Sequence, residues 1–222
     1  MPYRAPGPFD LPRVPVQPYL VPSIDGTPAE QLARLRATND AAIKTNHVIH
    51  HGGLGHHVQN WHAYHRAPSR IGRIAAVDCA TRIGMFCGGT MAEGWACYAT
   101  GLMEELGFLS PLERLSEQHS RVRFLGRAIV DIELHQATMT FDDAVRFYAE
   151  QVGMHPDTAR AEAVKNSMFP CTALMYWLGT QGILDLRASR PQNSLREFHD
   201  ELLSHGSIPV PMIARLMTDG AA

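Results

Sequence analysis

The chain has 222 residues, of which 45% are hydrophobic and 19% charged, and its formal net charge is −2. This length suits one domain whose core needs no disulfide, and the near-neutral charge without a basic cluster argues against nucleic acid or an anionic membrane as a partner. No apolar run reaches the length of a membrane span and the four cysteines lack paired spacing, so a soluble, cytoplasmic protein with buried, reduced thiols is expected.

Proline dominates the first part of the chain. Eight of the fifteen prolines fall within the first 28 residues. Because proline lacks a backbone donor and disrupts helices, residues 1–27 are predicted to form an extended arm. Residues 28–222 are predicted to form a single domain.

Helical signals begin at Thr27, the predicted N-cap, with Pro28 at the first helical position and Glu30 completing a capping box. This helix is expected to run to about Ile49. Glycines break residues 50–91 into shorter pieces, although "HHVQNWHAYHRA" has the spacing of a short helix. Further helices are predicted at 91–108, 110–139, 141–153, 156–168, 170–189, 194–204 and 211–217. No alternating strand pattern is present, so the predicted fold class is all-α.

The 110–139 helix has a clear apolar side. Such a side normally faces the core of a domain. Its residues are Leu112, Leu115, Val122, Leu125, Ile129 and Val130.

The stretch "HVIHHGGLGHHVQ" contains five histidines, at positions 47, 50, 51, 56 and 57. Packing alone explains such a cluster poorly, because each buried imidazole needs a hydrogen-bond partner. Two of the five are therefore predicted to bind a metal. His47 and His51 would share one face of a continuous helix, whereas His50 and His56 converge only if the glycine-rich segment loops out.

A third ligand is expected from another element. Glu93, in "MAEGWACY", has apolar neighbours and an acid is rarely buried without a partner. The alternative is a solvated glutamate in the first turn of a helix, stabilised there by the helix dipole.

Arg127, Asp131 and His135 follow one another at four-residue steps on one helix stripe. Asp131 can orient a histidine there, or the three residues can form a structural ion pair inside a bundle. Tyr176, in "FPCTALMYWLG", is either a core residue with a satisfied hydroxyl or a donor to developing negative charge.

Five stretches, in this order, resemble the carboxy-terminal half of a large bacterial family of zinc-metallopeptidase-like proteins, the domain of unknown function numbered 885. The family signature reads HExxPGHHxQ, EGWAxYAE, VDxxxH, PGQAxxYxxG and FHxxxLxxGxxP. The corresponding stretches here are "HHGGLGHHVQ", "EGWACYAT", "VDIELH", "PCTALMYWLG" and "FHDELLSHGSIP".

The resemblance implies a helical, gluzincin-like metal site in residues 28–222, which then form the catalytic domain. It moves the preferred metal ligands to His50, His56 and Glu93, with His57 as the alternative second imidazole. The cofactor it implies is a divalent transition metal, zinc first, with iron or copper as alternatives. The candidate catalytic residues are His51, His57, Arg127, His135 and Tyr176.

The chain departs from the signature at several positions. His51 stands where the family has the glutamate expected to act as general base. Leu54 replaces the proline, Thr100 the second glutamate of the EGW segment, and Cys171 and Thr172 the Gly-Gln pair. General-base assistance is typically worth about 10²–10⁴-fold in rate, so ordinary peptide hydrolysis is not expected.

Three hypotheses follow. The first is a metalloenzyme repurposed for non-hydrolytic chemistry on a small molecule, such as elimination, cyclisation or oxidation in a specialised biosynthetic pathway, with His51 as a base of near-neutral pKa. The second is a zinc-dependent hydrolase of an amide or peptide bond that uses a histidine base. The third is a non-catalytic metal-binding subunit. Most of the family's amino-terminal half has no counterpart here, so either the proline-rich arm or a second subunit must cover the cleft, and a homodimer is expected.

Overall fold

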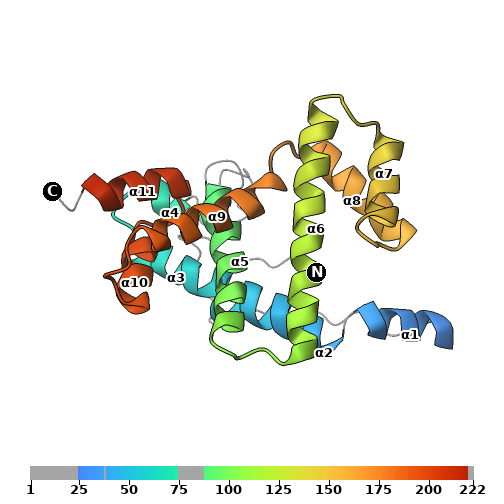
Figure 1. Cartoon of the computed structure of the whole chain (residues 1–222), viewed down its shortest axis with the longest axis horizontal. Coiled ribbons are helices and arrows are strands. Elements are labelled where there is room, and N and C mark those ends of the chain that lie inside the picture. Colours follow the sequence, from blue (N-terminus) through green and yellow to red (C-terminus); the bar gives the residue numbers. More distant parts are fainter. Residues whose placement is uncertain (1–24, 38, 75–87, 220–222) are drawn as a thin grey trace.

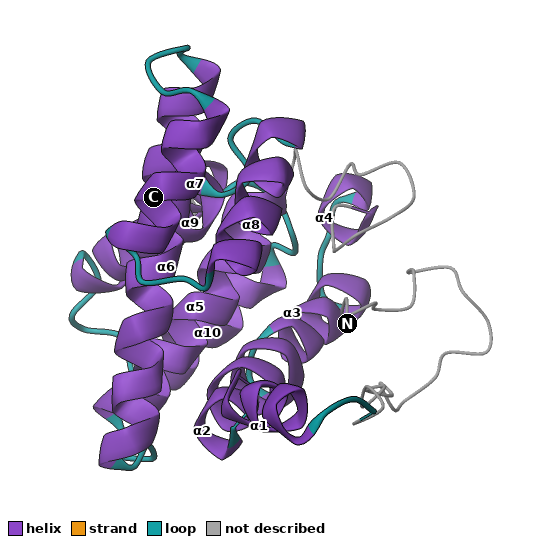
Figure 2. Cartoon of the chain, turned by 90° about the vertical axis from the view of Figure 1, so that its right-hand side faces the viewer, coloured by secondary structure: helices purple, strands orange, loops and turns teal. Residues whose placement is uncertain are grey.

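The computed structural model describes residues 25–37, 39–74 and 88–219, and every regular element within these ranges is a helix (Figures 1 and 2). The predicted all-α fold class is confirmed. Almost all of the predicted proline-rich arm, residues 1–27, lies outside the described residues. The helices are α1 Pro28–Ala37, α2 Asp40–Ala42, η1 Ile43–Gly53, α3 His56–His65, α4 Arg70–Ile74, α5 Gly89–Glu105, α6 Pro111–His135, α7 Phe141–Glu150, α8 Pro156–Met168, α9 Leu174–Ala188, α10 Leu195–Ser204 and α11 Val210–Asp219.

Local capping signals place most helix starts. The predicted box at Thr27 forms, because the Glu30 carboxylate accepts from the Thr27 backbone N–H at 2.8 Å. Ser110 and Thr140 also begin helices with complete capping boxes. The predicted continuous helix from Pro28 to Ile49 is wrong, since the Asn39 side chain accepts from the Ala42 N–H at 3.0 Å and caps a new helix.

The main core lies where α5 crosses α9, the pair of helices with the most extensive contact. Their backbones meet at two glycines: a Cβ on Gly94 would lie 2.4 Å from the Gly179 carbonyl carbon. Because the two helices cross so closely, the "EGWACYAT" segment of α5 lies against α9. The buried side chains around it are Met91, Trp95, Tyr98, Ile183, Leu186, Phe198, Leu202, Leu203, Ile208, Val210, Ile213 and Met217.

A second core lies on the other side of α6, where α7 and α8 pack (Figure 1). Tyr148, Val130 and Ala163 are completely buried in it. α6 therefore stands between two cores, with polar Arg127 and Asp131 buried among its neighbours.

The apolar side of α6 is largely outside both cores, which corrects the sequence-based expectation. Leu112, Leu115, Val122, Leu125 and Ile129 are all exposed, and only Val130 of the predicted set is buried. α6 contacts the rest of the chain through a different face, which includes Gly126, Arg127, Ala128 and Asp131. The amphipathic pattern is real, but its apolar side faces solvent.

Two further expectations concern cysteines and membrane spans. In the described part of the chain Cys97 and Cys171 are free thiols, and Cys171 is exposed, so the prediction of buried thiols is wrong for that residue. Among the described helices, none combines the length and the apolar character that crossing a bilayer requires.

Candidate metal centre

The turn between η1 and α3 brings the histidines together. Gly52 leaves helical geometry, with φ −91° and ψ −119°. The Gly55 N–H then donates to the Ile49 carbonyl at 2.9 Å, so α3 begins directly against the end of η1. As a result the rings of His50 and His56, six positions apart, have their centroids 4.9 Å from each other. The looped-out geometry expected for this pair is confirmed.

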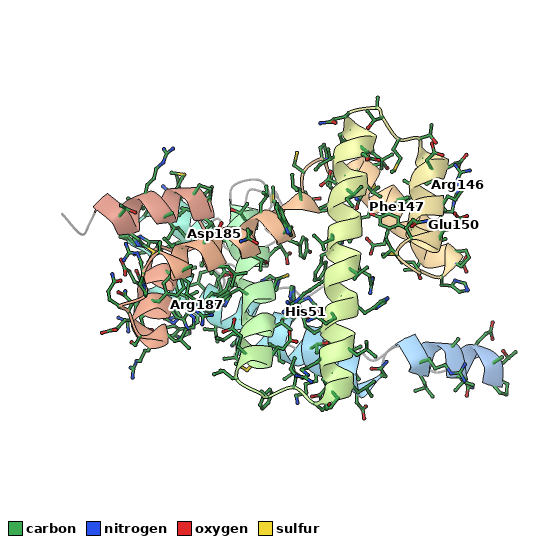
Figure 3. The ribbon with its side chains drawn as sticks, in the orientation of Figure 1. His51, Arg146, Phe147, Glu150, Asp185 and Arg187 are labelled. Atoms are coloured by element: carbon green, nitrogen blue, oxygen red, sulfur yellow. The ribbon has the colours of Figure 1, made fainter. Side chains whose placement is uncertain are left out.

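Three imidazoles converge in this turn. One ring nitrogen from each of His50, His51 and His56 lies within 4.8 Å of the others, a group that can hold a metal ion. His50 and His56 are buried, and His51 is half-buried. Figure 3 shows His51 between the ribbons of α5 and α6.

Glu93 extends from α5 to the same point. Its Oε2 atom lies 3.4 Å from Nε2 of His50 and 3.4 Å from Nε2 of His56. This oxygen is buried. Ligand atoms that bind one tetrahedral zinc ion at 2.0–2.1 Å are about 3.3 Å apart. The spacing therefore fits a shared metal ion, and the solvated-glutamate alternative is wrong.

The protonation states of these residues suit metal binding. Burial lowers the pKa of His50, and burial together with the neighbouring His50 and His56 lowers that of His51 to about 3. Burial opposes ionisation of Glu93, but His56 and His50 outweigh it and hold its pKa well below the usual value. Neutral imidazoles and a carboxylate are the forms that bind metal. The near-neutral pKa expected for a His51 base is wrong.

Two other histidines of the cluster lie apart from this group. His57 is exposed on α3. His47 is next to His51, with ring centroids 5.7 Å apart, but it does not belong to the converging group. The structure thus brings together His50, His51 and His56 from the five candidates.

Tyr176 and Arg127 lie beside the centre. The Tyr176 ring stacks on Phe124 at a centroid distance of 4.9 Å, and the Arg127 guanidinium lies 5.1 Å from the Tyr176 ring centre. Burial, followed by the nearby Glu93 charge, raises the Tyr176 pKa well above its ordinary value. The Tyr176 hydroxyl therefore stays protonated. Arg127 is held in place by Glu162, with Nε 3.0 Å from Oε2.

Asp131 and His135 serve a different part of the fold. Asp131 accepts from the backbone N–H groups of Cys171, Ala173 and Leu174 at 2.8, 2.9 and 3.2 Å, and so caps the start of α9 from α6. His135 Nδ1 lies 3.1 Å from Asp131 Oδ1. His135 is eleven positions beyond Phe124, about 16 Å along the helix axis, so the structure does not bring it to the centre.

A cavity of about 390 Å³ adjoins the centre. His50, Cys97, Phe124 and Tyr176 line it on the side of the metal group. Cys97 Sγ lies 4.0 Å from His50 Nδ1, and burial raises the pKa of this thiol well above its usual value. The thiol is therefore neutral and lines the cavity as a small side chain.

Sequence reasoning missed the more distant wall of this cavity. There Arg121 of α6 joins two carboxylates, with Nε 2.7 Å from Glu117 and Nη2 3.1 Å from Glu104 of α5. Thr100, which replaces a family glutamate, and Trp177 of α9 also line the cavity. The four-residue spacing of Glu117 and Arg121 was a visible signal for one of these pairs.

Comparison with known proteins identifies the family of the chain. A family model described as "Bacterial protein of unknown function (DUF885)" matches residues 7–217. The chain belongs to the DUF885 family. No curated protein matches this DUF885 chain.

Solved structures similar to this DUF885 chain include a "putative lipoprotein of unknown function" from Shewanella oneidensis, with a TM-score of 0.80 and 26% identity over 97% of this chain. A second is a "putative lipoprotein" from Colwellia psychrerythraea, with a TM-score of 0.71 and 28% identity over 82% of this chain. The DUF885 chain spans 38% of the first of these proteins and 30% of the second.

Proposed function

We propose that this DUF885 chain is a metal-dependent enzyme that transforms a small molecule by non-hydrolytic chemistry. The observation that carries the proposal is the position of Glu93 Oε2, 3.4 Å from Nε2 of both His50 and His56. These three residues would hold a divalent transition metal, and His51 is close enough to add a third imidazole. Imidazole-rich sites suit zinc, copper and iron.

His51 is the main argument against hydrolysis. Burial, followed by the neighbouring His50 and His56, lowers the pKa of His51 to about 3, which makes it a weaker base than an ordinary imidazole. His51 therefore serves better as a nitrogen ligand than as a substitute for the family's glutamate. This role leaves the site without the base that peptide hydrolysis would use.

The remaining residues would bind and orient the substrate. A metal ion held by these residues would supply Lewis acidity and, with His51 as the fourth ligand, would polarise a substrate oxygen through a fifth coordination position. The protonated Tyr176 hydroxyl would donate to negative charge that develops on the substrate, a role supported by the contacts of Arg127 and Phe124 with its ring. The cavity of about 390 Å³ beside His50 is large enough for a small molecule.

A non-catalytic metal-binding subunit is the second candidate. It is favoured by the convergence of four groups, since His50, His51, His56 and Glu93 together would complete a tetrahedral shell and leave no position for substrate. The cavity against His50 favours the enzyme instead.

Metal analysis of the purified protein tests the proposal. We expect one transition-metal ion per chain, lost in His50→Ala and in Glu93→Ala. His57→Ala is the matched control, because this exposed histidine of the same stretch should leave the metal content unchanged. Absence of stoichiometric metal, or equal metal in all variants, would refute the proposal.

The reaction class needs a separate assay. Metal-loaded protein is incubated with amide and peptide libraries and, in parallel, with small molecules whose elimination, cyclisation or oxidation is followed by mass spectrometry. Amide hydrolysis that disappears in His51→Ala would favour the hydrolase over the non-hydrolytic enzyme. Loss of metal in the same variant would support His51 as a ligand.

A further inference from the structure

The exposed apolar stripe of α6 follows a heptad pattern. Six positions alternate three and four residues apart, the spacing by which one helix packs along another, and five of them are apolar. The residues of the stripe are Leu115, Gln118, Val122, Leu125, Ile129 and Ile132. The five large apolar side chains among them are 40–65% exposed, and no member of the stripe is charged.

We propose that the α6 stripe pairs with the α6 stripe of a second copy of the chain, antiparallel, about a twofold axis between residues 123 and 124. The register is self-complementary, because reversing the helix about this point places Leu115 opposite Ile132 and Val122 opposite Leu125. Gln118 then faces Ile129, and its amide already donates to Glu104 at 3.2 Å within its own chain. One surface can therefore serve both copies, as a twofold interface requires.

The size of the surface fits a modest dimer. Two stripes, each with five half-exposed aliphatic side chains, would together bury on the order of 1,000 Å², about the minimum for a biological interface and the size of a weak, reversible one.

Pairing would also complete the cavity. Leu125 belongs to the stripe and lines the cavity, together with Trp177 and Leu184 of α9, which are 45% and 37% exposed. A second helix on the stripe would lie over this exposed edge and place Val122 of the second copy beside Leu125. The dimer thus shields the cavity next to the candidate metal centre from water.

Mass measurement by light scattering tests the pairing. We expect twice the 24.6 kDa of one chain, and a single-chain mass for the double variant V122E/I129E. Leu216→Glu is the matched control, because Leu216 on α11 is 49% exposed and outside the stripe, so this variant should stay dimeric. Far-UV circular dichroism checks that each variant keeps its helices. A single-chain mass for the unaltered protein at every concentration would overturn the proposal.

Disulfide trapping tests the antiparallel register. Leu115→Cys and Ile132→Cys proteins, each in a Cys171→Ser background, are mixed, re-equilibrated and oxidised. A cross-link that needs both variants supports the register, whereas cross-linking of Leu115→Cys with itself would overturn it in favour of a parallel pair. Metal content is measured in V122E/I129E and is expected to be unchanged, so a failure of the pairing is distinguishable from a failure of the proposed function.

Discussion

Gly55 begins α3 against the backbone of His50 so closely that a Cβ at position 55 would lie 1.7 Å from the His50 carbonyl oxygen. The contact is with backbone, which cannot rotate away as a side chain can. This approach sets the position of His56 relative to His50, and with it the spacing of the candidate metal ligands. The glycine is therefore part of the site although it contributes no ligand atom.

Gly55→Ala is expected to separate η1 from α3 and to abolish high-affinity metal binding, with a loss of about 2–4 kcal/mol in the free energy of unfolding. Gly53→Ala is the matched control, since its nearest neighbour, the Val48 carbonyl oxygen, is 3.8 Å from the added Cβ. Calorimetric zinc titration and urea unfolding measure the two effects. Equal zinc affinity and equal free energy of unfolding in the two variants would show that the close approach of Gly55 to the His50 backbone is unimportant.

Glu93→Gln is expected to weaken zinc binding about a hundredfold or more, because a neutral amide replaces a carboxylate that lies 3.4 Å from two imidazole nitrogens. Glu105→Gln, on the same helix but paired with Arg187 at 3.0 Å, should keep the parent affinity. Competition with a chelator of known affinity measures the zinc affinity of both variants. A Glu93→Gln protein with unchanged affinity would exclude Glu93 as a ligand.

The metal-free protein is expected to lose stability as the pH falls from 6.5 towards 5. His51 has a pKa of about 3 in the folded chain against about 6.5 when unfolded, so the unfolded chain binds more protons in this range. Because the His51 ring is partly solvated, the full linkage effect is reduced, and the free energy of unfolding is expected to change by about 1 kcal/mol per pH unit. Burial lowers the pKa of His50 as well, which acts in the same direction.

Urea unfolding at several pH values between 7 and 5 measures this slope, with His51→Asn as the reference because asparagine does not titrate. The slope should be smaller in the variant. Parallel curves for the two proteins would mean that His51 titrates normally in the folded chain. Saturating zinc should raise the unfolding free energy at every pH without reducing the slope of the parent curve, since bound metal keeps the folded ligands unprotonated while the unfolded chain still takes up protons.

Asp131→Asn is expected to destabilise the fold by about 2–3 kcal/mol. The buried Asp131 carboxylate accepts three backbone N–H groups at the start of α9, and an amide nitrogen would face one of these donors instead. Asp185→Asn, at an exposed position of α9 that Figure 3 labels, should change stability little. Because Tyr176 lies in the first turn of α9, the Asp131 variant should also shift the tyrosine fluorescence of the folded protein.

Much of the fold was predictable because helix starts depend on neighbouring residues. The serine and threonine caps at Ser110 and Thr140 act within three positions of the chain, so the local sequence contains the whole interaction. The pairing of His50 with His56 was also within reach, since the intervening glycines allow a looped turn. The break at Asn39 was missed because the apolar pattern continues across it, although the cap itself is local.

The sequence by itself determined the helical class, the capped ends of the helices and the small set of residues that can bind a metal. Only the tertiary structure decided which of these residues meet, because the distances from His50 and His56 to Glu93 depend on how α5 packs against the turn. It also decided the protonation of His51, which follows from burial. The outward direction of the α6 stripe is a third such property, since an amphipathic pattern shows which residues share a face but not which surface covers it.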